Sequence, residues 1–126
     1  MKPRESMLRL RRFEAEERAR KVADIEAMIR EFETMAADLA RQISSEEERT
    51  GVKDPKHFAY STFAKAAAQR RDNLVISVED LRVKLAAAEV ERDIALDNLR
   101  KLESGEGRET GRGRLRGEQV TGAQFR

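Results

Sequence analysis

The sequence predicts an all-α fold in which two long helices form an antiparallel coiled-coil hairpin. Two stripes of mostly apolar residues alternate in steps of three and four, which is the spacing of a coiled-coil seam. A short segment rich in turn-forming residues, "TGVKDPKH", lies between them. Charged residues make up 40% of the 126 residues and aromatic residues 5%, so a thick globular core is not expected.

The first stripe predicts a helix over about residues 3–49. It is apolar from Val22 onward, whereas Arg11 and Arg18 interrupt it before that point. Its members are Leu8, Arg11, Ala15, Arg18, Val22, Ile25, Ile29, Phe32, Ala36, Leu39 and Ile43.

The second stripe predicts a helix over about residues 58–103. Gly51 suits the left-handed conformation that ends a helix, and Asp54-Pro55 is typical of an N-cap followed by a first-turn proline. We therefore expect the turn at residues 50–57. The members of the second stripe are Tyr60, Ala64, Ala67, Arg71, Leu74, Val78, Leu81, Leu85, Ala88, Arg92, Ala95, Leu99 and Leu102.

A fold about this turn pairs residues whose numbers sum to about 107. Large apolar residues then face each other near the turn, whereas three near-consecutive layers toward the open end pair alanine with arginine. Such layers contribute less than the ~1.5–3 kcal/mol of a buried leucine or isoleucine, so we expect the open end to be loose. The pairs are Val22 with Leu85, Ile29 with Val78, Ile43 with Ala64, Ala15 with Arg92, Arg18 with Ala88, and Arg11 with Ala95.

Residues 104–126 hold six of the seven glycines and show no periodicity, so the hairpin is expected to occupy residues 1–103 and a flexible Gly/Arg-rich tail the rest. The tail is either a solvated terminus or an arm that contacts an acidic surface or nucleic acid. Residues 1–103 hold 21 basic and 21 acidic side chains, so the formal charge of +2 comes from the tail. With the basic first twelve residues nearby, the open end is expected to be cationic.

The residue inventory argues against an enzyme. There is no cysteine, and the one histidine, His57, lies in the predicted turn, so neither a catalytic triad nor a thiolate metal site is expected. The glycine-rich tail lacks the lysine of a P-loop. We therefore expect no catalytic residue, no cofactor and no metal.

The body of the chain has no net positive charge, so nucleic-acid binding is not expected. The basic N-terminus is followed by no continuous apolar segment, and no apolar run approaches the ~20 residues of a membrane span. A cytoplasmic location is therefore expected.

Several apolar residues fall outside both stripes, and such surfaces usually mark interaction sites. A different protein or a second copy of the chain could cover them, or they are scattered surface residues. These residues are Leu10, Phe13, Met28, Met35, Ile76, Val83, Val90 and Ile94.

Two further groups are candidate partner-binding residues. The aromatics beside the turn, Phe58, Tyr60 and Phe63, are expected to anchor a partner that a polar ridge orients. The ridge consists of Gln69, Arg70 and Asn73, for which plain solvated helix surface is the alternative. The basic residues Arg4, Arg9 and Arg12 are expected to contact a second, acidic partner.

The runs "DPKHFAYSTFAKAAAQRRDNLVISVEDLRVKL" and "IEAMIREFETMAADLARQISSEEERTGVKDP" resemble the flagellar FliJ family of alphaproteobacteria over about residues 1–103. The resemblance is most specific in "HFAY" and "QRRDNL", and the Gly/Arg tail departs from the family pattern. It implies a non-enzymatic component of the flagellar type III protein export apparatus, which serves motility, at the cytoplasmic face of the flagellar base.

The same resemblance implies the partners. One end of the hairpin would enter the pore of the hexameric export ATPase, and its side would contact the cytosolic domain of the export gate. In some family members the partners include export chaperones. The chain would associate with the membrane only peripherally, through these partners. The alternative reading of the sequence is a structural coiled-coil protein that assembles with itself.

Overall fold

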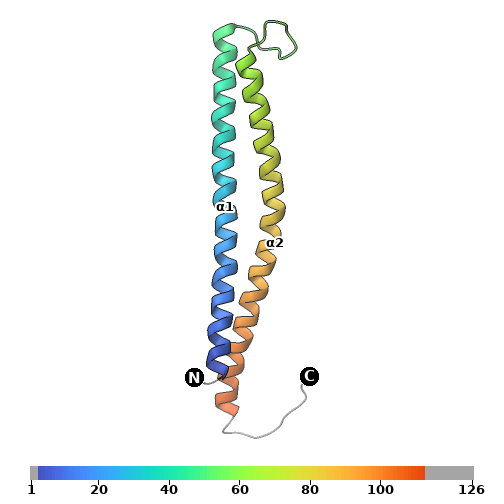
Figure 1. Ribbon diagram of the computed structural model, residues 1–126. Coiled ribbons are helices and arrows are strands. Elements are labelled where there is room, and N and C mark those ends of the chain that lie inside the picture. The colour runs from blue at the N-terminus through green and yellow to red at the C-terminus, as the bar shows by residue number, and fades with distance from the viewer. Residues whose placement is uncertain (1–2, 113–126) are drawn as a thin grey trace. The chain divides into compact units, whose positions relative to one another are not determined.

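The computed structural model describes the backbone of residues 3–112 and the side chains of residues 3–105. Two long helices, α1 (Pro3–Thr50) and α2 (Thr62–Arg112), make up this part of the chain, which contains no strand (Figure 1). The predicted all-α class with two long helices is confirmed. The chain divides into a turn unit, residues 21–88, and a terminal unit, residues 1–20 with 89–126.

Local chemistry sets both ends of α1. Pro3 stands at its first position, where the missing N–H group costs no helical hydrogen bond. Thr50 ends the helix, and Gly51 follows with a φ of 77°, the left-handed conformation that a side chain disfavours. The Gly51 N–H donates to the Glu47 carbonyl at 2.9 Å, as in a glycine C-cap.

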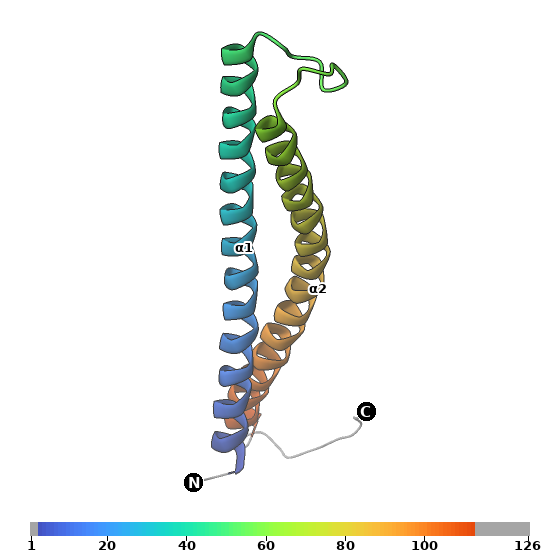
Figure 2. The same ribbon diagram turned by 45° about the horizontal axis from the view of Figure 1, so that its top comes forward.

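The start of α2 differs from the prediction. The Asp54 carboxylate accepts a hydrogen bond from the Lys56 N–H at 2.9 Å and stabilises a local turn, not the helix. The helix begins later, because the Ser61 hydroxyl accepts the Ala64 N–H at 3.1 Å and acts as its N-cap. The connection between the helices is therefore longer than the predicted turn, and Figure 2 shows it standing away from the end of α1.

Helix α2 also ends later than the prediction. It continues to Arg112, so the first part of the predicted Gly/Arg tail, residues 104–112, is helical. Adding residues to an existing helix gains one hydrogen bond each without a new nucleus, which offsets the cost of glycine. The remainder of that tail, residues 113–126, lies outside the described residues.

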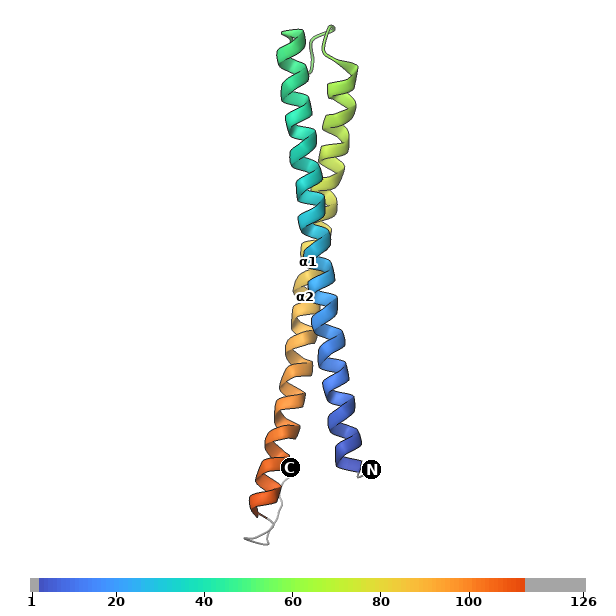
Figure 3. The same ribbon diagram turned by 90° about the vertical axis from the view of Figure 1, so that its left-hand side faces the viewer.

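In the turn unit, α1 and α2 lie side by side and antiparallel (Figures 1 and 3). One core cluster consists of Val22, Ile25, Ile29, Val78, Leu81 and Ala88, with Phe32 and Leu85 packed against it. A second cluster consists of Leu39, Ile43, Ala64 and Ala67. The groupings agree with the predicted register, because the pairs Val22 with Leu85, Ile29 with Val78, and Ile43 with Ala64 each fall in one cluster.

The terminal unit has a thinner seam. Its buried apolar residues are Leu8, Ala15 and Ala95, and two of these three are alanines. Arg11 and Arg92 are half-buried, as expected for stripe positions. Arg18 is exposed, against the prediction that places it in the seam, because a charged guanidinium without a buried partner keeps its hydration.

The seam of the turn unit is bordered by two flanks, because coiled-coil positions e and g lie on opposite sides of positions a and d. The acidic flank consists of Glu26, Glu33, Ala40 and Glu47 of α1 with Ser61, Ala68, Val75 and Arg82 of α2. The basic flank consists of Lys21, Met28, Met35, Gln42 and Arg49 of α1 with Phe63, Arg70, Ser77 and Lys84 of α2.

Candidate partner-binding surface

The basic flank exposes three large apolar side chains. Met28 is 42% exposed, Met35 is 44% exposed and Phe63 is 52% exposed. The helical repeat places Met28 and Met35 two turns apart on α1, and Phe63 and Arg70 two turns apart on α2. No acidic residue occupies a position of this flank. It therefore combines apolar contact area with positive charge.

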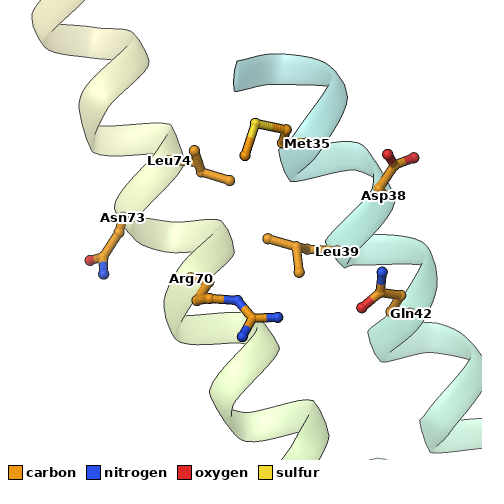
Figure 4. Close-up of a pocket in the computed structure, with 7 residues that line it drawn as sticks. All are labelled: Met35, Asp38, Leu39, Gln42, Arg70, Asn73 and Leu74. Carbon is orange, nitrogen blue, oxygen red and sulfur yellow. The ribbon is translucent and has the colours of Figure 1, made fainter. Parts of the chain in front are cut away.

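A pocket of about 420 Å³ lies on this flank, between α1 and α2. Figure 4 shows Met35, Leu39 and Leu74 converging from the two helices to form an apolar floor. The Arg70 side chain extends toward α1, where Gln42 lies opposite it. The remaining lining residues are Asp38 and Asn73, whose side chains point away from the floor.

The Arg70 guanidinium has no hydrogen-bond or ion-pair partner among residues 3–105. The carboxylate nearest to it in the pocket, that of Asp38, is bonded to Arg41 in the next turn of α1. The side chains that line the pocket therefore leave the positive charge of Arg70 uncompensated.

The acidic flank, in contrast, is bridged within the molecule. Arg82 of α2 forms an ion pair with Glu33 of α1. At the turn end, the Tyr60 hydroxyl donates to the Glu47 carboxylate at 2.6 Å, and the Ser61 hydroxyl donates to Glu46 at 2.7 Å. These bonds join the end of α1 to the start of α2.

The hydrogen bonds from Arg49, at 2.7 and 3.0 Å, and from Ser61 lower the pKa of Glu46 from 4.5 to about 2. The bond to the Glu47 carboxylate raises the pKa of Tyr60, because loss of the phenol proton would leave two negative charges in contact. At neutral pH Glu46 is therefore ionised and Tyr60 keeps its proton, which are the states that these hydrogen bonds require.

The three aromatics of the predicted anchor lie in different surroundings. Phe58 is 96% exposed in the connection, and its ring stacks on that of His57 with centroids 4.7 Å apart. Tyr60 is half-buried against the Leu39–Ala67 cluster and its hydroxyl is engaged by Glu47, so it is part of the core. Phe63 alone of the three lies on the basic flank.

The three residues of the predicted polar ridge also lie in different surroundings. Arg70 and Asn73 line the pocket, whereas Gln69 is exposed on α2 outside it. Sequence reasoning assigned Arg70 and Asn73 to a docking site but did not connect them with Met35, Leu39, Gln42 and Leu74. The predicted register could have shown that Met35 and Arg70 lie near each other, because both are next to the same seam residues on one side of the hairpin.

Of the basic residues predicted to contact a second partner, Arg9 is exposed and Arg4 is half-buried in the terminal unit. The Arg12 guanidinium lies 3.8 Å from the Glu103 carboxylate. Within the described part of this unit the sequence has equal numbers of basic and acidic residues, because residues 89–105 are acidic and offset residues 3–20. The predicted cationic end would therefore depend on residues outside the described part.

The other apolar residues predicted to lie outside the seam are exposed. In the turn unit Ile76 is 55% exposed and Val83 is 72% exposed, on the face of α2 away from the seam. In the terminal unit the exposed residues are Leu10, Phe13, Val90 and Ile94.

Among residues 3–105 no cluster of histidine and carboxylate side chains has the geometry to hold a metal ion. Neither described helix has an apolar stretch long enough to cross a membrane. No protein-family model matches the sequence, and no curated protein or solved structure matches it at a significant level.

Proposed function

We propose that the protein is a non-enzymatic component of a flagellar type III protein export apparatus, where it couples the export ATPase hexamer to the export gate through its coiled coil. The observation that carries this proposal is the basic flank of the turn unit. Phe63, and Arg70 of the "QRRDNL" run, are exposed there, and Arg70 lines the pocket and forms no hydrogen bond or ion pair with α1 among the described residues.

In this proposal the basic flank contacts the cytosolic domain of the export gate. Phe63 supplies apolar area and Arg70 supplies charge, while the seam keeps both in register. The tight turn unit suits this task, since a partner that binds a preformed surface avoids the entropic cost of ordering it.

The terminal unit is assigned to the ATPase hexamer. Arg4, Arg9 and Arg12 are the residues through which it would contact an acidic pore, together with the basic tail. A seam built from alanines contributes little burial energy, so this unit can adjust its packing on binding. Export chaperones remain additional partners in this proposal, and the location is the cytoplasmic face of the flagellar base.

The second candidate is a structural coiled-coil protein that assembles with itself. Ile76 and Val83 favour it, because two exposed β-branched residues seven positions apart repeat the spacing of a seam. Light scattering separates the two: a monomer supports the export component, and a stable tetramer supports self-assembly.

Crosslinking in a flagellated bacterium tests the proposal. A photoreactive residue placed at Phe63 is expected to capture the export gate, and one placed at Arg12 is expected to capture the export ATPase. A photoreactive residue at Lys65, on the same helix but away from the basic flank, is the control. Capture of neither protein at Phe63 and Arg12 would contradict the proposal.

A further inference from the structure

We infer that the basic flank of the turn unit binds an amphipathic helix of a partner protein whose apolar face covers the Met35–Leu39–Leu74 floor and whose carboxylate pairs with Arg70. The inference rests on the proposed function in so far as it gives the chemistry of the partner at that same site. Its physical basis is independent of which protein supplies the helix.

The shape of the pocket favours a helix over a small molecule. The floor lies in the groove between two helices and is open on its outer side, with Met35 almost half exposed. A small ligand needs a site that encloses most of its surface, whereas a helix laid along a groove buries one face over several turns. The line of Met28, Met35 and Phe63 offers contacts beyond the pocket itself.

The residue types favour an adaptable apolar contact. Two of the exposed apolar side chains are methionines, whose unbranched chains fit partner side chains of different shapes. Phe63 adds a rigid ring at the turn end of the flank. The partner helix would therefore present apolar residues in steps of three and four, which is the spacing that a two-helix groove accepts.

The charge of the flank specifies an acidic partner. Arg70 and Lys84 have no ion-pair partner among the described side chains, and none of the flank positions is acidic. A carboxylate beside Arg70 would form the charge-assisted hydrogen bond that the molecule itself does not supply.

A second copy of the chain fits this surface poorly. A symmetric contact through this flank would bring the same patch of both copies together. Arg70 and Lys84 would then meet a surface that also carries arginine and lysine, and the one carboxylate in its pocket, that of Asp38, is already bonded to Arg41. Electrostatic complementarity therefore selects a different, acidic chain.

The test uses the full-length protein and two synthetic helical peptides. Both peptides have leucines in steps of three and four, and one residue at the edge of the apolar face is glutamate in the first and lysine in the second. Fluorescence anisotropy gives the Kd of each. We expect the wild-type chain to bind the glutamate peptide about tenfold more tightly than the lysine peptide.

An exchange of charges makes the test specific. Arg70→Glu is expected to reverse the preference, so that the lysine peptide binds more tightly. Lys65→Glu is the matched control, with the same charge change on the same helix outside the pocket, and it should keep the wild-type preference. Equal Kd values of the two peptides for the wild-type chain, or no binding of either, would overturn the inference.

The methionine methyl groups locate the contact by NMR. The signals of Met28 and Met35 should shift on addition of the glutamate peptide, while that of Met7, in the terminal unit, should stay. A shift confined to Met7 would contradict the inference. So would a shift of Met28 and Met35 with protein concentration alone, because a second copy would then cover the flank.

The outcome is separable from that of the proposed function. If the peptides bind through Arg70 but the export gate domain does not bind the chain, the inference stands and the proposed function fails. If the export gate domain binds the chain but neither peptide binds it, the proposed function stands and the helix-binding inference fails.

Discussion

The two flanks of the turn unit differ in where their polar groups find partners. On the acidic flank, Glu33 pairs with Arg82 and Glu47 accepts a hydrogen bond from Tyr60, so charges of one helix are satisfied by the other. On the basic flank, Arg70 has no such partner among the described residues and lies beside exposed methionine and a pocket. Both flanks border the same seam. The difference between them therefore distinguishes residues that hold the helices together from residues that are available to another molecule.

The largest predicted difference in stability is between substitutions at two neighbouring residues of α1, one in the seam and one on the basic flank. Ile29 lies in the seam and is 5% exposed, whereas Met28 lies on the basic flank. Ile29→Ala should lower the free energy of unfolding by ~2–5 kcal/mol through lost burial and a cavity. Met28→Ala should change it by less than ~0.5 kcal/mol. Urea denaturation followed by circular dichroism measures both, and equal losses would mean that the basic flank is part of the core.

A smaller effect is expected at two serines of α2. Ser61 caps the helix and bonds to Glu46, whereas Ser77 lies on the basic flank. Ser61→Ala should cost about 1 kcal/mol of unfolding free energy, because the Ala64 N–H loses its acceptor. Ser77→Ala should stay within about 0.5 kcal/mol of the wild type. A Ser61→Ala variant as stable as the wild type would show that Ser61 does not fix the start of α2.

The smallest effect concerns pH. Because the hydrogen bonds from Arg49 and Ser61 lower the folded-state pKa of Glu46 to about 2, its contribution to stability is present above pH 4.5 and is lost as the pH falls toward 2. Glu46→Gln should make the stability of the chain less dependent on pH in that window. Urea denaturation at a series of pH values measures this.

Glu48→Gln is the matched control for that series, since it removes a neighbouring carboxylate that has no hydrogen-bond partner among the described side chains. If Glu46→Gln and the wild type lose stability in parallel between pH 4.5 and 2, the bridge at the turn end does not stabilise the fold.

The two helices and their register were predictable because the alternating steps of three and four continue along both stripes, even where arginine replaces an apolar residue. All buried apolar residues of the described part, from Leu8 to Ala95, lie on the two predicted stripes. The start of α2 was mispredicted because two capping residues compete in the connection. Asp54-Pro55 closes a local turn, and Ser61, followed by Thr62, is the cap that hydrogen-bonds the helix.

Only some residues of the candidate site were predictable from the sequence, and their arrangement was not. Phe63 and Arg70 were assigned to partner binding, and the structure places both on the basic flank. The assignment of Tyr60 missed its hydroxyl bond to Glu47, which depends on a contact across the seam. The shape of the pocket depends on the side-chain rotamers of Met35, Leu39 and Arg70. The heptad spacing predicts the helix face of each residue but not its rotamer.

The most direct test of the account is the binding of the purified cytosolic domain of a flagellar export gate to the full-length chain. The Phe63→Ala/Arg70→Glu variant is compared with Val83→Ala/Lys65→Glu, which makes the same kinds of change outside the basic flank. The account predicts that the first variant loses at least about tenfold in affinity while its helical signal and melting stay near wild type, and that the second binds normally. Equal binding by both variants, or no binding by the wild-type chain, would contradict it.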